Sequence, residues 1–452
     1  MSDCSPSLYS ARVKFPSGST SIVEDLLLKS AIVASLLALI LINLRLQTFA
    51  PVLAAASRHG VGAILLRPCI LWFGVGSALL AFRTILWLCY RSPAVATRES
   101  AVPLTVVIPA YNEGAMVAKA IDSVARANYD LDKLEIIVVD DGSTDDTWFH
   151  IQEAIARQSR NIRAIRLERN SGKREALATG FRIGSGDIFV TVDSDSVVDP
   201  NSLLALAGPF ASERIGVVAG RVLVYNRSEG IIPRMLHVRF ILSFDFLRAC
   251  QSTFRTVYCS PGALSAYRAS AVRKVLDGWV EQHFLGSRAT IGEDRALTND
   301  IMGLGYDSIY QRAAMVLTVV PTTYGKLCRM FLRWDRSFIR EEIRFARIVW
   351  KRPPLVRSIA LLDCLVNDLR FPAACLIAGL MCAALMMDSL VLPRMLAAIG
   401  IVAFMYSLYY LHSERSLDIV YGVLFSYFSF FSLFWIFPWA LATVRARGWL
   451  TR

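Results

Sequence analysis

The sequence lacks the cysteine and glycine patterns that define several common protein classes. Its nine cysteines are scattered through 452 residues, and no two of them form a Cys-x-x-Cys pair. This spacing excludes a disulfide framework and a zinc site built from paired cysteines, and it indicates a reducing compartment. The chain also has no Gly-x-Gly-x-x-Gly after its first predicted strand and no Gly-x-x-x-x-Gly-Lys-Ser/Thr segment, which excludes the usual dinucleotide and P-loop sites.

Charged residues are also scarce. They make up 19% of the chain, whereas 54% of the residues are hydrophobic and the mean hydropathy is +0.44. This composition is too apolar for an ordinary soluble enzyme, and the apolar excess is concentrated at the two ends. The net charge of +12 predicts contact with anionic lipid headgroups and an anionic sugar-nucleotide substrate, and no binding of nucleic acid.

The N-terminal part of the chain predicts a membrane anchor. Residues 1–25 are polar and are expected to be disordered, and residues 26–91 are expected to hold two transmembrane helices. A cleaved signal peptide is the alternative, but the long polar leader and the second apolar segment count against it. Arg83 lies inside the second segment; we favour an arginine that reaches the headgroups over one that faces a polar channel.

The C-terminal part predicts further membrane contact. Residues 326–370 are expected to form amphipathic interface helices, residues 371–441 transmembrane helices, and residues 442–452 a basic tail. The expected spans are Phe371–Met387, Pro393–Leu411 and Leu417–Ala440. Two spans before the central domain and three after it would place the tail outside, against the positive-inside tendency. Either the last segment turns back near Pro438, or residues 355–370 add a span, or the tail is external; we favour an internal tail.

Residues 100–325 alternate between strand and helix patterns. The strand patterns are LTVVIP, LEIIVVD, IRAIRL and IFVTV, and the helix patterns run over Glu113–Arg126, Asp145–Arg157 and Gly172–Ile183. Alternation at this spacing predicts a Rossmann-like α/β domain with a mainly parallel sheet and helices on both faces.

Polar residues follow three of these strands, at Tyr111-Asn112-Glu113, Asp140-Asp141 and Asp193-Ser194-Asp195. The carboxyl ends of parallel strands lie along one edge of a sheet, so these segments predict one site. Two carboxylates one residue apart after a buried strand need a cation or strong hydrogen bonds, and hard oxygen ligands suit Mg²⁺ or Mn²⁺ carrying a phosphorylated ligand. A solvated turn is the alternative.

Two further segments carry candidate chemistry. Asn170-Ser171-Gly172-Lys173-Arg174 opens a helix, where backbone amides and two cations can cradle a diphosphate. In Gly292-Glu293-Asp294-Arg295, the aspartate could be a capped, ion-paired structural acid or a general base, and the residues alone do not choose between them.

Seven motifs occur in order: PAYNE, VDDGST, SGKREAL, VDSDS, SPGALSAYR, GEDR and FLRWDRS. This set resembles the family 2 glycosyltransferases that build β-linked polysaccharides through a membrane, in the branch of hyaluronan synthase, chitin synthase and nodulation chitooligosaccharide synthase. The resemblance covers roughly residues 100–345 and extends weakly to residues 448–452. It implies a GT-A-type cytoplasmic domain between N- and C-terminal transmembrane helices.

The resemblance also implies roles for individual residues. Asp294 resembles the catalytic base, Lys173 the lysine near the diphosphate, and Asp195 the metal ligand. The other implied contacts are Tyr111, Glu113, Asp140, Asp141 and Asp193 with the nucleotide sugar, and Arg295, Arg333 and Trp334 with the acceptor or diphosphate. The family usually has Gln where Met330 stands, which puts long-chain processivity in doubt.

The resulting expectation is an inverting β-glycosyltransferase in the plasma membrane that uses UDP-N-acetylglucosamine, alone or with UDP-glucuronate, and Mg²⁺ or Mn²⁺. It would extend a growing glycan and secrete it through its own helices. One alternative is a nonprocessive transferase that adds one sugar to a lipid-linked acceptor. A second is a membrane channel or receptor with a degenerate transferase domain, against which the retention of Asp193, Asp195 and Asp294 counts.

Beyond the family motifs, arginines recur at helical spacing after residue 328. They are Arg329, Arg333, Arg336, Arg340, Arg344 and Arg347. The spacing places them on one face of a helix, with Glu341 and Glu342 interrupting the largely apolar opposite face. We expect the first three to turn toward the nucleotide and the last three to meet lipid headgroups.

Overall fold

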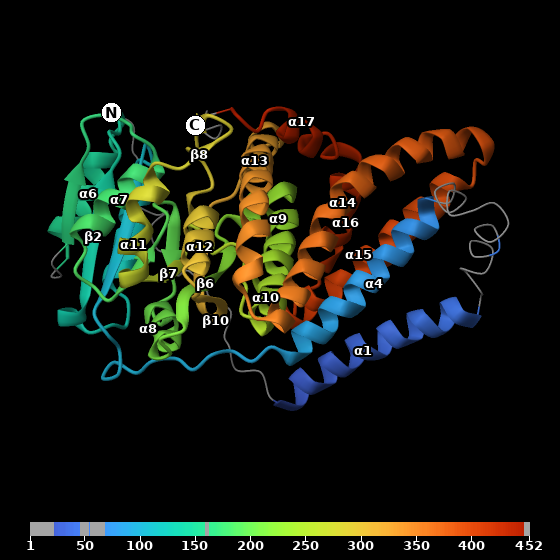
Figure 1. Ribbon diagram of the computed structural model, residues 1–452, viewed down its shortest axis with the longest axis horizontal. Helices are drawn as coiled ribbons and strands as arrows, with labels where there is room; N and C mark the ends of the chain where they lie inside the picture. Colours follow the sequence, from blue (N-terminus) through green and yellow to red (C-terminus); the bar gives the residue numbers. More distant parts are fainter. Residues whose placement is uncertain (1–21, 46–53, 55–67, 159–161, 447–452) are drawn as a thin grey trace, which may run out of the picture.

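The computed structural model describes residues 22–45, 54, 68–158 and 162–446 (Figure 1). The sheet domain lies at one end of the molecule and the long apolar helices lie at the other. Most of the expected disordered segment and residues 447–452 of the expected tail lie outside the described residues, so the predictions for them stay predictions.

The first half of the sheet domain has the predicted parallel order. Strands β1 (Leu104–Ala110), β2 (Leu134–Asp140), β3 (Ile162–Arg166) and β4 (Ile188–Thr191) pair in parallel in the order β3-β2-β1-β4. The helices between them are α5 (Met116–Ala125), α6 (Thr147–Ala156) and α7 (Lys173–Ile183). β1 is wholly buried because helices cover both faces of the sheet, and this burial explains its unbroken apolar run.

The second half of the sheet mixes strand directions, which the sequence patterns did not indicate. The order continues β7 (Ser265–Arg268), β6 (Ile215–Val224), β10 (Asp307–Thr318) and β5 (Ser196–Val198). β7 is antiparallel to both β4 and β6, and β5 is antiparallel to β10. The chain returns to the sheet edge through the loop before β7, and this return brings residues 258–263 beside the end of β4.

Helices cover this half and lead toward the apolar end of the molecule. On the sheet domain lie α8 (Ser202–Ala207), α11 (Ala269–Val280) and α12 (Glu293–Gly303), with a short β8–β9 hairpin (His283–Phe284, Ser287–Arg288). Between the sheet and the apolar helices lie α9 (Ile231–Ile241), a π-helical turn (Leu242–Leu247), α10 (Arg248–Thr253) and the long amphipathic α13 (Tyr324–Ile348) (Figure 1).

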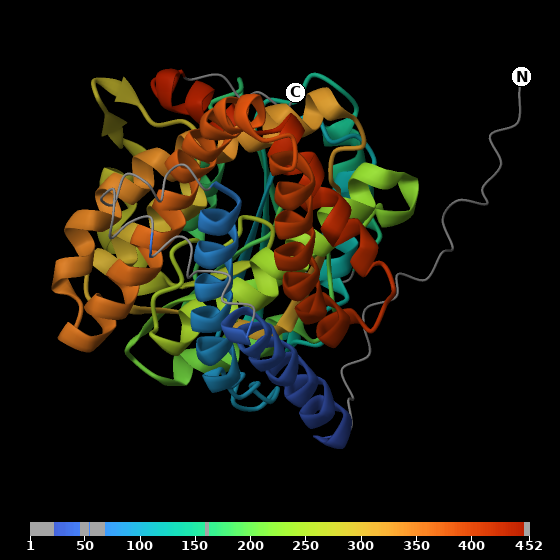
Figure 2. The same ribbon diagram turned by 90° about the vertical axis from the view of Figure 1, so that its right-hand side faces the viewer.

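The apolar helices are α1 (Ile22–Arg45), α4 (Pro68–Cys89), α14 (Pro354–Met387), α15 (Val391–Glu414), α16 (Ile419–Ser432) and α17 (Ile436–Ala442). Viewed from their end of the molecule, α4 lies between α14 on one side and α15 with α16 on the other (Figure 2). Among the described residues, three helices are long and apolar enough to cross a membrane, or four if the pair α16–α17, bent by 51°, is one span. The break in that pair falls at residues 433–435, before the predicted turn at Pro438.

Two expectations for these helices were wrong. Residues 355–370 do not form a separate interface helix, since α14 continues through them to Met387. Arg83 does not reach toward headgroups: it is 7% exposed, and its Nη2 donates to Asn367 Oδ1 at 2.5 Å and lies 3.5 Å from Asp363 Oδ1. The guanidinium therefore joins α4 to α14, because a charge buried among apolar helices needs a partner.

Candidate active site

The turn before α7 is fixed by Asp141 at the end of β2. Its two carboxylate oxygens accept hydrogen bonds from the amides of Ser171 at 2.7 Å and Gly172 at 2.8 Å. The first residue of α7, Lys173, is thereby placed at the carboxyl edge of the sheet. Its ammonium contacts Asp193 Oδ1, just beyond β4, and lies 3.1 Å from Glu293 Oε1 at the start of α12.

Asp294 follows Glu293 in the first turn of α12. Gly292, the residue before the helix, has a left-handed backbone with φ of 70°, which sends the chain sharply into α12. Asp294 Oδ2 accepts a hydrogen bond from the amide of Gly262 at 3.2 Å. Both readings of this aspartate therefore have a physical basis: it is held at a helix start, and it also faces the site.

Burial, followed by the nearby charge of Glu293, raises the pKa of Asp294 to about 6. Burial also disfavours the ionised form of Glu293, but Lys173, Arg333 and a backbone hydrogen bond together outweigh this effect and lower the pKa of Glu293. Lys173 keeps its positive charge, since its pKa is raised by the carboxylates despite its burial. The two adjacent acids thus differ: Glu293 stays ionised, and Asp294 can exchange a proton near neutral pH.

The loop before β7 completes this side of the site. A Cβ added at Gly262 would lie 2.8 Å from Lys173 Nζ and 3.5 Å from Asp193 Oδ1. A side chain at this position would therefore displace the lysine ammonium from its place beside Asp193. The SPG motif therefore brings an amide donor to Asp294 and leaves the lysine room beside Asp193.

The other predicted nucleotide contacts lie along the same edge. Glu113, just beyond β1, accepts a hydrogen bond from Ser194 Oγ at 3.0 Å, and Tyr111 is partly buried at the end of that strand. Asp140 is fully buried, accepts from the Ser143 amide at 3.1 Å and pairs with Arg166 at 3.2 Å. The three polar strand ends meet, as their placement on one sheet edge requires.

Asp195, the predicted metal ligand, is the last residue before β5. Its Oδ1 accepts hydrogen bonds from Thr318 Oγ1 at 3.1 Å and Ser196 Oγ at 3.2 Å. Among the described residues, no three His, Cys, Asp or Glu side chains form a group that could hold a metal ion by themselves. The carboxylate oxygens gathered at this edge fit a divalent ion that takes its remaining ligands from phosphates and water.

The predicted acceptor residues separate into two groups. Arg333 and Trp334 are partly buried on α13; Arg333 lies close enough to Glu293 to help lower its pKa, and Trp334 packs 5.6 Å from the ring of Phe331. Arg295, on α12, is buried, pairs with Glu342 and lies 4.6 Å from the ring of Phe338, both of them on α13. Met330 is also buried, within the main hydrophobic core.

The expectation that the later arginines of α13 meet headgroups was wrong for two of them. Arg340 donates to the carbonyl of Ile291 and to Glu341 Oε1 at 2.9 Å, and Arg344 lies 2.5 Å from Asp300 Oδ1 on α12. Only Arg347 of this group is exposed. Glu341, expected only to interrupt an apolar face, is fully buried because it neutralises these arginines.

The structure thus brings Lys173, Asp193, Glu293 and Asp294 together, with Glu113 and Asp195 on the same edge. Sequence reasoning gave no role to Glu293, Gly262 or Glu341. An acid between arginines on an apolar helix face is the signal that could have indicated the buried ion pairs of Glu341.

Comparison with known proteins agrees with this architecture. Residues 105–276 match the family described as Glycosyl transferase family 2. Over 367 residues the chain is 31% identical to a hyaluronan synthase of Streptococcus pyogenes, an alignment that covers 77% of this chain and 83% of that protein. The chain belongs to glycosyl transferase family 2. This membership confirms the resemblance of the ordered motifs.

Two other relatives of this family 2 chain are N-acetylglucosaminyltransferases. The protein of Mesorhizobium japonicum is 34% identical over 240 residues, and that of Azorhizobium caulinodans is 34% identical over 261 residues. The alignments cover 53% and 56% of this chain, and they span 56% and 65% of the relatives' own lengths.

A mannosyltransferase of Pyrobaculum calidifontis, solved in complex with GDP-Man and Mn²⁺, has a similar structure. Its TM-score is 0.59 at 19% identity, and the match covers 81% of this chain and 99% of that protein. At this identity the likeness establishes the fold alone, and it confirms the GT-A class of the sheet domain.

Proposed function

We propose that this protein is a membrane-embedded inverting β-glycosyltransferase that polymerises sugar from UDP-sugar donors. UDP-N-acetylglucosamine is the proposed donor, alone or with UDP-glucuronate, and the product is a hyaluronan-like or chitin-like polysaccharide secreted through the apolar helices. The position of Asp294 carries the proposal. It is a partly buried carboxyl with a raised pKa beside the Lys173–Asp193 pair, at the carboxyl edge of a family 2 sheet.

In this mechanism Asp294 is the general base. It accepts the proton of an acceptor hydroxyl while that oxygen forms a bond to the anomeric carbon of the donor and the bond to UDP breaks. Attack from the face opposite the leaving UDP converts an α-linked donor into a β linkage. The Gly262 amide, 3.2 Å from Asp294 Oδ2, fixes the carboxyl toward the acceptor.

Lys173 would meet the diphosphate as negative charge develops on it. The lysine is already held between Asp193 and Glu293, so it needs little reorganisation when the donor binds. Asp195 would hold Mg²⁺ or Mn²⁺, which supplies charge neutralisation at the diphosphate when bound. Arg333 and Trp334 would receive the acceptor, with the tryptophan stacking on a sugar ring.

The first experiment measures UDP release by the full chain in detergent with Mg²⁺ or Mn²⁺. The donors are UDP-N-acetylglucosamine, UDP-glucuronate and both together, and product length is determined on a gel. Long product only with both donors supports a hyaluronan-type polymerase, and product from UDP-N-acetylglucosamine alone supports a chitin-type one. A single sugar on lipid would favour the nonprocessive alternative, and no UDP release with any donor would contradict the proposal. Chelation of the metal is expected to lower UDP release.

The raised pKa of Asp294 predicts an acidic limit to catalysis. Because the base must be ionised and its pKa is about 6, kcat/KM should fall by about tenfold per pH unit below that value and level off above it. The profile of kcat/KM between pH 4.5 and 8, with folding checked at each pH, measures this limit. A profile that stays level down to pH 4.5, as expected for an aspartate with its usual pKa near 4, would contradict the raised pKa of the base.

A further inference from the structure

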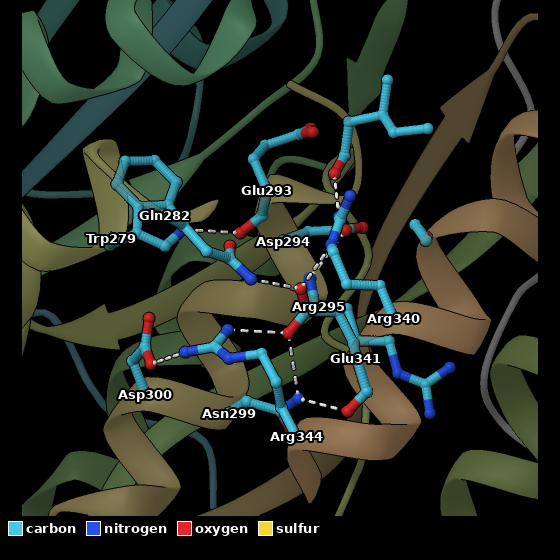
Figure 3. A network of polar contacts seen from close by, with 12 residues as sticks. Trp279, Gln282, Glu293, Asp294, Arg295, Asn299, Asp300, Arg340, Glu341 and Arg344 are labelled. Carbon is cyan, nitrogen blue, oxygen red and sulfur yellow. Dashed lines mark hydrogen bonds and ion pairs between the residues drawn. The ribbon is translucent and has the colours of Figure 1, made fainter. Parts of the chain in front are cut away.

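The start of α12 is connected to α13 by a network of buried charges that the reaction described above does not use (Figure 3). At its centre is Glu341, which has no measurable exposure. Its Oε1 accepts from Gln282 Nε2 at 2.7 Å and Arg340 Nε at 2.9 Å, and its Oε2 accepts from Arg344 Nη1 at 2.8 Å and Asn299 Nδ2 at 3.3 Å. A carboxylate has about four acceptor positions, so all of them are filled.

One arm of the network ends beside the base. Arg340, which is 3% exposed, donates through Nη2 to the carbonyl of Ile291, three residues before Asp294. Gly292 lies so close to α13 that an added Cβ would be 2.3 Å from Ser337 Cβ. The turn before Asp294 is therefore held against α13, and its left-handed glycine leaves no space there for a side chain.

A second arm reaches the donor side. Gln282 Oε1 accepts from Arg174 Nη1 at 2.8 Å, and Arg174 is the residue after Lys173 in α7. Arg174 also contacts the carbonyl of Trp279, whose Nε1 donates to the carbonyl of Glu293 at 2.9 Å. The helix that carries the lysine and the helix that carries the base are thus connected through the same carboxylate.

We propose that Glu341 is a positioning residue that sets the base Asp294 against the donor-side Lys173 by joining α12 and α7 to α13. The inference rests on the proposed role of Asp294. This proposal gives α13 a second role. Besides presenting Arg333 and Trp334, this helix couples the membrane side of the molecule to the geometry of the base.

The energetics favour a role beyond simple stabilisation. Burial opposes the ionised form of Glu341, and Arg344 and Arg340 outweigh it and lower its pKa. A neutral side chain of the same shape would leave Arg340 without its counter-charge and Arg344 with Asp300 alone, and it would turn an amide donor toward other donors. We expect these unfavourable contacts to be relieved by a movement of the turn at Ile291 and Gly292, where the network meets it.

The test compares Glu341→Gln with Arg347→Gln, which removes an exposed charge from the same helix. In Glu341→Gln we expect kcat to fall about 10- to 100-fold from misplacement of the base. The donor KM should change much less, because Lys173 keeps its own pairs. The acidic limb of kcat/KM should move down by about one pH unit as water reaches Asp294. Arg347→Gln should match the parent chain.

The groups facing Asp294, whose charges are unchanged in these variants, are Glu293 on α12, Lys173 on α7, Asp193 after β4, Cys259 in the loop before β7, Tyr267 on β7 and Arg248 on α10. Glu341→Gln also removes a negative charge, which lowers the pKa of Asp294 in the same direction, so the charge-conserving Arg340→Lys decides whether a shifted limb reports exposure of the base. A purely structural role would lower the folded fraction and leave kcat per UDP-binding site and the limb unchanged; that result would overturn the inference.

Arg340→Lys is the second variant, in case Glu341→Gln does not fold. The lysine keeps the positive charge beside Glu341 but cannot reach both that carboxylate and the Ile291 carbonyl. We therefore expect the acidic limb of kcat/KM to shift in the same direction by a smaller amount. An unchanged limb and kcat in this variant would also overturn the inference. Asp294→Asn, measured in parallel, separates the two proposals. Full activity in that variant would refute the proposed base, whereas its loss together with a parent-like Glu341→Gln would refute only the positioning role.

Discussion

Replacing Asp294 by asparagine is expected to lower UDP release by about 10²–10⁴-fold, the usual contribution of a general base. The amide keeps the shape of the side chain but cannot take the proton from the hydroxyl of the acceptor sugar. Donor binding should persist, because Lys173 and Asp193 keep their contact. Steady-state UDP release and calorimetric UDP binding measure the two effects separately.

The matched control is Asp277→Asn, the same change at a side chain that is 93% exposed on α11. It should leave both UDP release and UDP binding unchanged. If Asp294→Asn retained turnover, its role as the base would be wrong. If it lost UDP binding as well, Asp294 would be needed for the donor site and not only for the chemical step.

Replacing Gly292 by alanine is expected to reduce both stability and activity strongly. Alanine in a left-handed conformation costs about 1 kcal/mol or more. Its Cβ would also overlap Ser337 of α13, adding about 1–3 kcal/mol of overpacking. Since relief requires α13 to move away from the turn before Asp294, kcat should fall together with the thermal unfolding midpoint in detergent.

Gly278→Ala provides the comparison. Gly278 is an exposed residue of α11, it has no atom within 4 Å of an added Cβ, and its backbone is helical. Alanine there should raise stability by about 0.5–1 kcal/mol and leave activity unchanged. Equal effects of the two substitutions would contradict the close contact between Gly292 and α13.

Part of the fold could be predicted from the sequence because local patterns determine it. The runs LTVVIP and LEIIVVD are buried on both faces and read as parallel strands, which they are. The short strand β7 carries no such pattern in its four residues, and its antiparallel direction depends on where the chain returns after α10. Strand direction of this kind is a property of the whole sheet and not of its residues.

Part of the candidate site could also be predicted from the sequence, and part of it could not. Acids that follow strand ends were placed together, since parallel strands share an edge, and Asp294 was assigned through the resemblance of its motif. The charged partners around these acids are not predicted from the sequence: Glu293 pairs with Lys173, and Glu342 pairs with Arg295. These pairs join residues far apart in the chain, so no spacing reports them.

The arginines of α13 make the distinction clear. Their spacing by itself determined an amphipathic helix, because periodicity fixes which side chains share a face. Only the tertiary structure decided that Arg340 and Arg344 face α12 and Glu341, and that Arg83 faces Asp363 and not the headgroups. The spacing of charged residues does not show whether their face contacts water, lipid headgroups or a buried counter-charge. The choice depends on which element packs against it, since burial makes an unpaired charge costly and a paired one acceptable.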